Sequence, residues 1–527
     1  MCGILFTNNP GIDHKRFSNA LNLMSHRGPD CSPRQQTLRN FKLGHTRLKI
    51  LDLDDRSNQP FWSGDKRYVM IYNGEVYNYK ELSVEYALNL QTTSDTEVII
   101  ELYSIMGPKM LNLLNGMFSI IILDTKTNEY FAARDRLGIK PLYYTEAGGY
   151  LTAASEIASV IELLDGVDLD EVGIRQYRKL RCFFNGHTLY SNINMFPAGC
   201  YMKNGKMHKY WSLPEVYQNP PDDEELKDLI KSTVSYRCIS DVSVGSYLSG
   251  GLDSTIVASL ASKPCTWTVG FEKTNEFEWA KMASDKFDSL HTEVRIDEAE
   301  FEDISRWMIK KRKEPLSVPN EVLLYKMTKE VKNRNTVILS GEGADELFFG
   351  YDRIFRWAAE NKWDIEEFDR LYSYGSHDDI EIVEYALSPF LHLGSALEIV
   401  ASFFQVSHLH GLLRRLDNST MLCSVEARVP FVDHRLVERM AGVPFEYRIK
   451  NGIVKSPLKR IFKDIIPPEI INRTKIGFPV PLDKMKFLNA RSNNDNRKAM
   501  DSWLEFNLNV LMGGSIYCTQ TICFPGK

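Results

Sequence analysis

The stretch Ser249-Gly250-Gly251-Leu252-Asp253-Ser254 joins an apolar, strand-like run at 242–248 to a helix-like run at 255–261. Two adjacent glycines allow positive φ angles and a close approach of the backbone to a ligand. We expect Ser249, Ser254 and Thr255 to supply hydroxyl groups and a helix N-cap. The free amide groups at such a helix start favour an anion, and a polyphosphate in particular. A plain Gly/Ser turn is the alternative, and the full six-residue string argues against it.

Asp253 is an unusual neighbour for a phosphate, because like charges repel. A divalent cation that bridges carboxylate and phosphate oxygens would remove the conflict. The loop is not a Walker loop, since no Gly-Lys-Ser/Thr follows the glycines. It resembles the pyrophosphate loop of ATP pyrophosphatases, which implies cleavage of ATP to AMP and pyrophosphate.

Bulk properties are those of a globular protein with more than one domain. The 527 residues exceed one ordinary core, and the hydrophobic and charged fractions are 43% and 25%. A net charge of −5 gives no reason to expect nucleic acid as a partner. The nine cysteines are scattered and fit reduced thiols in the cytoplasm. The apolar run 117–123 is shorter than the ~20 residues of a membrane span, and no signal peptide is predicted.

Cys2 follows the initiator methionine and precedes Gly3. Removal of Met1 would leave cysteine at the N-terminus, where the α-amino group, with a pKa of roughly 7.7–8.0, can act as base for its own thiol. A chance Met-Cys start is the alternative. Whether Met1 is removed cannot be decided from the sequence.

Four short motifs accompany Cys2, at 26–30, 44–48, 71–78 and 94–97. Taken alone, Asn73-Gly74 is typical of a hairpin turn, but beside a nucleophile its amide and backbone N–H could form an oxyanion hole. Asp95 lies in Ser94-Asp95-Thr96-Glu97, which predicts the cap of a helix, and on spacing alone it is only a cap residue.

Together these motifs resemble a class II glutamine amidotransferase domain of the N-terminal nucleophile (Ntn) hydrolases, and the likeness extends through 114–118 and 134–144. Joined to the 249–254 loop, the arrangement resembles glutamine-dependent asparagine synthetase over most of residues 1–485. The resemblance implies an αββα sandwich in which Cys2 attacks the glutamine amide. It also implies that Asn73 and Gly74 hold the oxyanion, and that glutamine is bound by Arg47, Asn73, Gly74, Glu75 and Asp95.

Beyond the loop, alternating strand-like and helix-like runs predict a doubly wound parallel sheet, whose ligands bind at the C-terminal ends of the strands. The motif Ser340-Gly341-Glu342-Gly343-Ala344-Asp345-Glu346 follows a buried strand. Three acids within five residues repel one another, so we expect a metal ion and a proton-transfer role there. An exposed acidic loop is the alternative, and the apolar flanks argue against it.

The family resemblance implies roles for further residues. Glu342 would act at the acyl-adenylate, and Asp253 and Asp345 would bind Mg²⁺. ATP would contact Leu248, Ser249, Gly250, Gly251, Asp253, Ser254, Val269, Ser340, Gly341 and Lys455. We place a glutaminase domain at 1–210 and a synthetase domain of adenine nucleotide α-hydrolase type, with added helices, at 211–527.

The resulting hypothesis is an enzyme that converts a carboxylate to an amide with ATP, Mg²⁺ and glutamine-derived ammonia. Aspartate is the expected acceptor, and a uronic acid of a sugar nucleotide is the runner-up. A non-catalytic relative would be expected to lack Cys2 or the carboxylates at 253, 342 and 345, all of which are present. Cys2, and a glutamate rather than a tyrosine at 342, argue against an intramolecular amide synthetase. We predict a cytoplasmic protein with small-molecule substrates, without a membrane or nucleic-acid partner, and with a homodimer as the candidate assembly. Residues 360–400 and the tail after 485 fit no pattern.

Overall fold

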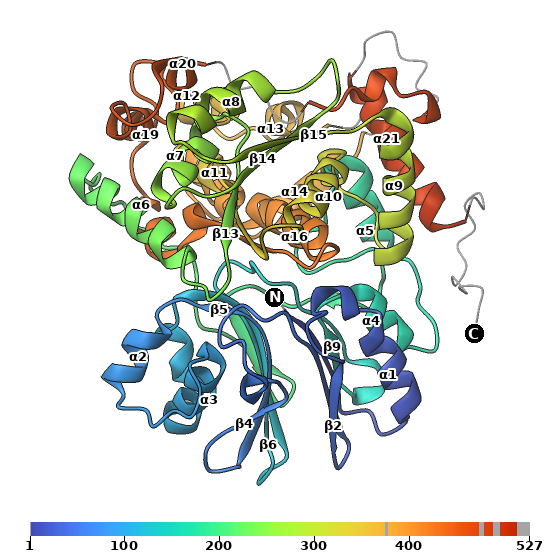
Figure 1. Cartoon of the computed structure of the whole chain (residues 1–527). Helices are drawn as coiled ribbons and strands as arrows, with labels where there is room; N and C mark the ends of the chain where they lie inside the picture. Colours follow the sequence, from blue (N-terminus) through green and yellow to red (C-terminus); the bar gives the residue numbers. More distant parts are fainter. Residues whose placement is uncertain (1, 375–377, 474–478, 489–495, 514–527) are drawn as a thin grey trace.

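A computed structural model describes residues 2–374, 378–473, 479–488 and 496–513. Figure 1 shows a lower part built on two facing sheets and an upper part built on a third sheet with many helices. The N-terminus lies where the two parts meet.

The lower part is a four-layer αββα sandwich, as predicted. Both sheets are antiparallel and have six strands, and α1 (His14–Asn22) and α4 (Ile157–Glu162) pack on one while α2 (Tyr79–Glu85) and α3 (Asp95–Met106) pack on the other. The first sheet has the order β10 (Asn194–Met195), β8 (Tyr143–Thr145), β9 (Thr152–Ala154), β1 (Gly3–Thr7), β3 (Phe41–Thr46), β2 (Arg34–Leu38). The second has the order β12 (Lys206–Lys209), β11 (Cys200–Lys203), β7 (Glu129–Arg134), β6 (Gly116–Asp124), β5 (Tyr68–Val76), β4 (Phe61–Trp62).

Strand β5 corrects one interpretation of the sequence. Asn73-Gly74 lies inside this strand and pairs with Ser119 and Phe118 of β6, so the pair is not a hairpin turn. Turn propensity is overridden here because both sides of β5 are covered and the strand pairs with β6 as far as Val76.

The upper part contains a five-stranded sheet in which every neighbouring pair is parallel, as predicted. Its order is β15 (His291–Arg295), β14 (Thr266–Gly270), β13 (Val244–Tyr247), β16 (Val337–Leu339), β17 (Glu426–Arg428). The associated helices are α6 (Asp223–Arg237), α7 (Leu252–Leu260), α8 (Phe277–Lys286), α9 (Glu298–Arg312) and α10 (Asn320–Val331). The chain reverses direction across the sheet at β13, which is where such sheets bind ligands.

The expected hydroxyl cap of α7 is absent, because Gly251 occupies the N-cap position without a side-chain hydrogen bond. The hydroxyls brace the loop instead. Ser254 and Thr255 donate to the Gly251 carbonyl at 3.2 and 2.7 Å, and the Gly251 amide donates to Ser249 Oγ at 3.3 Å. Gly250 has a φ of 70°, as the glycine pair predicted.

Residues that fitted no sequence pattern form a helical subdomain with its own apolar core. It comprises α12 (Asp352–Glu360), α13 (Ile365–Tyr372), α14 (Ile380–Leu387), α15 (Ala396–Phe403) and the π-helical turn η5 (Phe404–His408). The run from α15 through α16 (Leu409–Met421) has the length and, at 1.2, the mean hydropathy of a membrane span, and 44% of its apolar window is buried. Core helices of soluble proteins share these properties.

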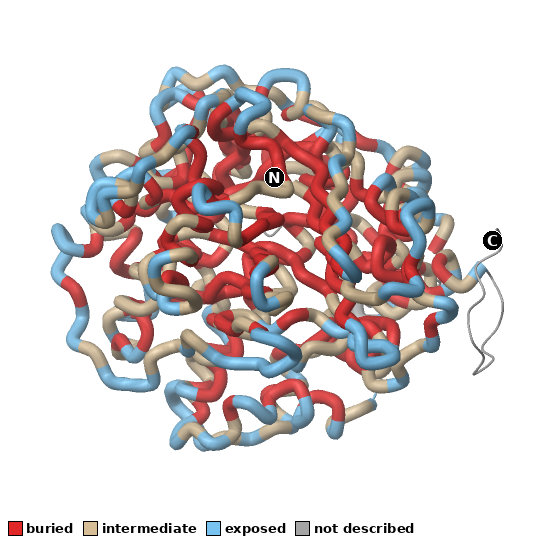
Figure 2. Tube along the Cα trace, turned by 90° about the horizontal axis from the view of Figure 1, so that it is seen from below, coloured by how far each residue is buried: buried red, intermediate tan, exposed pale blue. Residues whose placement is uncertain are grey.

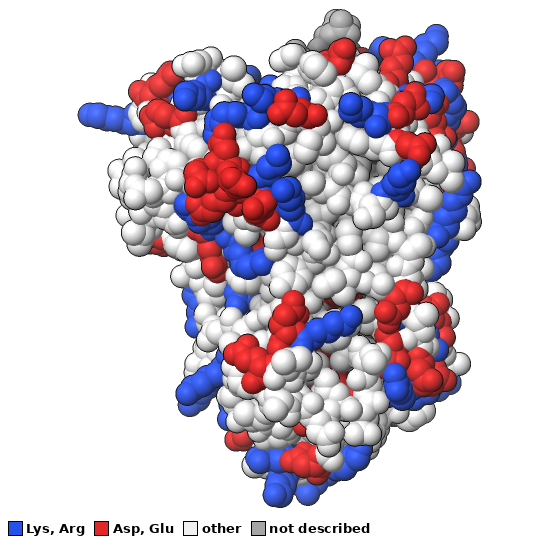
Figure 3. All heavy atoms as spheres, turned by 60° about the vertical axis from the view of Figure 1, so that its left-hand side comes forward, with Lys and Arg blue, Asp and Glu red and all other residues white. Residues whose placement is uncertain are grey.

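Further helices complete the upper part: α5 (Glu171–Leu180), α11 (Ala344–Phe348), α17 (His434–Met440), α18 (Phe445–Arg448), α19 (Ser456–Ile461), α20 (Pro468–Asn472) and α21 (Asn496–Leu511). Buried segments run through the middle of the molecule in Figure 2, with exposed loops and helices around them. On the face in Figure 3, basic and acidic side chains are mixed, with one acidic cluster beside basic groups. The seven cysteines among the described residues are all free thiols.

Candidate active sites

A pocket opens around Cys2, just before β1. Its empty volume is about 370 Å³, a figure that includes open solvent at the mouth. Arg47, Gly74, Glu75 and Asp95 line it, so four of the five predicted glutamine-binding residues share a pocket with the cysteine. The remaining lining residues are Leu48, Ile50, Leu51, Ser57, Gln59, Tyr72, Ser94, Thr96 and Glu426.

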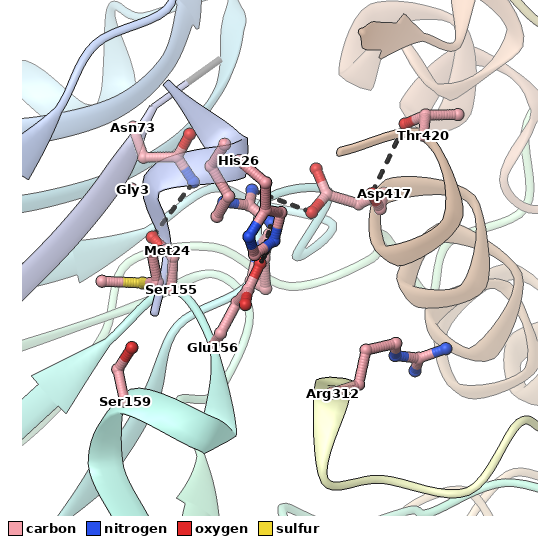
Figure 4. A network of polar contacts seen from close by, with 12 residues as sticks. Gly3, Met24, His26, Asn73, Ser155, Glu156, Ser159, Arg312, Asp417 and Thr420 are labelled. Carbon is pink, nitrogen blue, oxygen red and sulfur yellow. Dashed lines mark hydrogen bonds and ion pairs between the residues drawn. The ribbon is translucent and has the colours of Figure 1, made fainter. Parts of the chain in front are cut away.

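Asn73, the fifth residue, forms a hydrogen bond with Cys2 itself. Its Oδ1 accepts a hydrogen bond from the Cys2 nitrogen at 3.1 Å, and its Nδ2 faces Ser155 Oγ at 3.5 Å (Figure 4). Burial raises the pKa of the Cys2 thiol, so the thiol needs a base to ionise. The Cys2 nitrogen would become an α-amine on removal of Met1, and Asn73 already orients it.

Arg47 follows β3 and is almost fully buried. Its two terminal nitrogens donate to the carbonyls of Leu51, Asp52 and Asp54 and to Asn58 Oδ1. The guanidinium therefore supports the loop at the pocket wall. To clamp a substrate carboxylate it would have to exchange some of these partners.

Asp95 and Glu75 bring buried acid groups to the pocket. Ser94 caps α3 as predicted, and the Asp95 carboxylate accepts from the Tyr72 hydroxyl at 2.8 Å and the Val76 amide at 2.9 Å. Burial raises the pKa of Asp95 and raises that of Glu75 further, although Arg428 acts against the latter shift. Within the described residues, Glu75 Oε1 is buried without a hydrogen-bond partner, so a cationic ligand group would meet an unsatisfied acceptor.

One pocket residue and its ion-pair partner come from the parallel sheet, and neither was assigned from the sequence. Glu426 of β17 lines the Cys2 pocket, and Arg428 of the same strand lies 2.6 Å from Glu426 and 3.4 Å from Glu75. No local sequence pattern could show that this strand reaches the other half of the chain.

The second site lies where β13 and β16 end side by side. The loops after these strands are in contact, since a Cβ on Gly341 would come within 2.9 Å of the Ser254 nitrogen. Ser340 and Gly341 therefore adjoin the 249–254 loop. Leu248 donates its N–H to Trp267 on β14, the strand that also carries Val269.

Asp253 and Asp345 converge on one ammonium group. Lys455 Nζ lies 2.5 Å from Asp253 and 2.6 Å from Asp345. Burial opposes the charge of Lys455, but the two carboxylates together raise its pKa. Among the described residues no cluster of three or more His, Cys, Asp or Glu is arranged to hold a metal ion. Two carboxylates beside the 249–254 loop fit Mg²⁺, which usually takes only one or two protein carboxylates and completes its shell with phosphate oxygens and water.

The other two acids of the motif differ in their partners. Glu342 accepts from Arg415 of α16 at 2.9 Å. Glu346 is buried and accepts from the Tyr351 hydroxyl at 2.7 Å, and burial, followed by the charge of Asp345, raises its pKa to about 7. The motif therefore sets a paired carboxylate beside one that burial keeps partly neutral.

Known proteins match both halves of the chain. The asparagine synthase model matches residues 225–506, and the model of a glutamine amidotransferase domain matches 1–211. "Asparagine synthetase [glutamine-hydrolyzing] 1" of Bacillus subtilis (strain 168) is 29% identical over 92% of this chain and 87% of its own length. "Asparagine synthetase [glutamine-hydrolyzing] 2" of the same organism is 31% identical over 89% of this chain and 70% of its own. A solved glutamine phosphoribosylpyrophosphate amidotransferase from B. subtilis aligns at 16% identity over 47% of this chain and 60% of its own length, with a TM-score of 0.32.

Proposed function

Because the chain belongs to the asparagine synthase family, we propose that it moves the amide nitrogen of glutamine to the side-chain carboxylate of aspartate and so forms asparagine. ATP-dependent amidation with glutamine as nitrogen donor is the reaction of this family. The observation that carries the proposal is that one chain contains both a pocket around Cys2 and a second site, where the 249–254 loop packs against the acidic turn at 340–346. The names of the relatives support aspartate as acceptor.

In the first half-reaction the Cys2 sulfur attacks the side-chain carbonyl of glutamine. The α-amine of Cys2 takes the thiol proton, and Asn73 and the Gly74 N–H hold the oxyanion. Ammonia leaves, and water releases glutamate from the thioester. Glu75 and Asp95 bind the α-ammonium group of glutamine, and Arg47 binds its α-carboxylate.

In the second half-reaction an oxygen of the acceptor carboxylate attacks the α-phosphorus of ATP, and pyrophosphate leaves. The 249–254 loop, Ser340 and Gly341 bind the phosphates, Leu248 and Val269 contact the nucleoside, and Lys455 turns to the pyrophosphate. Asp253 and Asp345 would hold Mg²⁺, which supplies charge neutralisation on the phosphate oxygens. Glu342 takes a proton from ammonia as it attacks the acyl carbon and AMP leaves.

The domain boundary belongs to the proposal. The antiparallel sheets end at Lys209 and α6 begins at Asp223, which supports a glutaminase domain at 1–210 and a synthetase domain at 211–527. We also propose that the protein is cytoplasmic and forms a homodimer.

Replacement of Cys2 tests whether glutamine hydrolysis and amide synthesis occur at separate sites. We expect Cys2→Ala to abolish glutamine-dependent synthesis and to leave synthesis from ammonium salts. A variant that keeps Met1 should show the same pattern, because its α-amine is blocked. Glutaminase turnover that persists in Cys2→Ala would remove the cysteine from the mechanism.

The acceptor is tested by pyrophosphate release with ATP, Mg²⁺ and ammonia across a panel of carboxylates. We expect stimulation by aspartate, with AMP as the nucleotide product. Stimulation by a sugar-nucleotide uronic acid instead would contradict the asparagine assignment and keep the amidotransferase class. ADP and phosphate as products would contradict the proposed ATP chemistry.

A further inference from the structure

Arg27 lies in the 26–30 motif of the glutaminase half, and its guanidinium is fully buried. Its Nε donates to the backbone carbonyl of Cys2 at 3.1 Å, and its Nη1 donates to Glu156 at 3.3 Å. Its Nη2 donates to Asp417 at 3.0 Å. The residue that carries the nucleophile is thus tied through Arg27 to a carboxylate from the synthetase half.

Asp417 projects from α16 toward His26 and Glu156 in Figure 4. Its side chain is 3% exposed, and its second oxygen lies 3.4 Å from Lys140 Nζ. A carboxylate this deeply buried is stable only beside cationic partners. Arg27 and Lys140 therefore hold the Asp417 carboxylate in place, and the carboxylate in turn holds their side chains in place.

The same helix contacts the other site. Arg415 bonds Glu342 at 2.9 Å, and two residues along a helix turn by about 200°. Arg415 and Asp417 therefore project from nearly opposite sides of α16, one to the synthetase loop and one to the glutaminase centre.

We propose that Asp417 is a positioning residue of the glutaminase centre: it holds Arg27, and Arg27 holds the carbonyl of Cys2. The inference rests on the proposed function. An N-terminal Cys2 has a peptide bond on one side only, so the contacts of its nitrogen with Asn73 and of its carbonyl with Arg27 set where its sulfur points. A small displacement of a reacting group is enough to cost about 100-fold in rate.

The test compares Asp417→Asn with wild type in glutaminase kinetics and in ammonia-dependent AMP formation. We expect glutaminase kcat to fall about 10- to 100-fold, the range for a lost charge-assisted hydrogen bond. The KM for glutamine should be unchanged, because the variant touches none of the proposed glutamine-binding groups. Ammonia-dependent synthesis should also be unchanged. Alkylation of Cys2 by a diazoketone analogue of glutamine should slow in parallel with kcat.

Ser424→Ala is the matched control. Ser424 Oγ donates to the His26 carbonyl at 2.5 Å, so this variant loosens the same interface but removes no contact of the Arg27 guanidinium or of Cys2. We expect its glutaminase kcat to match wild type. Arg27→Lys and Asp417→Asn should each lower glutaminase kcat. In the double variant the two losses, expressed as free energies, should not add, since both substitutions act on one contact.

Unchanged glutaminase kcat in Asp417→Asn would overturn the inference. So would an equal loss in Ser424→Ala, or a parallel loss of both activities, because each would point to general disruption. If Asp417→Asn fails to fold, Asp417→Glu serves instead, and full glutaminase kcat with a displaced carboxylate would overturn the inference. A wild-type protein without any glutaminase turnover would refute the proposed function itself.

Discussion

Arg428→Met removes the cation that joins the parallel sheet to the Cys2 pocket. The Arg428 side chain is fully buried, and it bonds Glu426 at 2.6 Å, the Arg237 carbonyl at 2.9 Å and the Ile239 carbonyl, with Glu75 at 3.4 Å. Methionine approximates its length and leaves two buried carboxylates without this partner. Breaking such a pair costs about 3–5 kcal/mol.

Thermal unfolding measures this loss. A cost of that size corresponds to a fall in the unfolding midpoint of roughly 6–20 °C for a unit of 150–250 residues. Arg460→Met is the matched control: it breaks a contact of three hydrogen bonds with Asp223, but the Arg460 side chain is 38% exposed, so the expected cost is about 0–1 kcal/mol. Adding Glu426→Gln to Arg428→Met should restore part of the loss, because one uncompensated charge is removed.

Glutaminase kinetics measure the effect of Arg428→Met on the Cys2 pocket. Without Arg428 the pKa of Glu75, already raised by burial, should rise further. Glu75 would then be neutral over a wider pH range and bind the glutamine ammonium group less well, so KM for glutamine should increase. A midpoint shift no larger than that of Arg460→Met, together with an unchanged KM, would refute the argument that Arg428 neutralises these acids.

Further predictions concern the loops and the pH dependence. Gly341→Ala should lower ATP-dependent pyrophosphate release and leave glutaminase turnover intact, because its Cβ would lie 2.9–3.1 Å from the backbone of Asp253 and Ser254; normal release would contradict the close packing. Burial works against the charge of Glu156, but His26 and Arg27 lower its pKa to about 2. This depressed pKa stabilises the fold above the ordinary glutamate pKa, and the contribution is lost as pH falls toward 2; Glu156→Gln should therefore be less stable at neutral pH and lose less stability on acidification, as unfolding midpoints from pH 7 to 3 would show. Glutaminase kcat/KM should rise with pH through the α-amine range, roughly 7.7–8.0, and a pH-independent rate would exclude that amine as the base.

Local chemistry determined much of this protein. The glycine pair at 250–251 and the acidic turn at 340–346 each follow a buried strand, and such short-range patterns predict the two loops and a parallel sheet that places both at the C-terminal ends of its strands. Cys2 and Asn73 were candidates because an N-terminal nucleophile needs a base and an oxyanion hole, whereas the role expected of Asp95 came only from the family resemblance. Turn propensity misled at Asn73-Gly74, where pairing with β6 decided the backbone.

Only the tertiary structure decided which residues of the two halves contact each other. Arg428 and Asp417 are buried charges of the second half, and the partners that tie them to the first half, Glu75 and Arg27, are separated from them by hundreds of residues. Sequence fixes that a buried charge needs a partner, because an isolated one is too costly to bury. Which partner it finds depends on how the sheet edge β17 and helix α16 meet the Cys2 pocket, and no local pattern encodes that meeting.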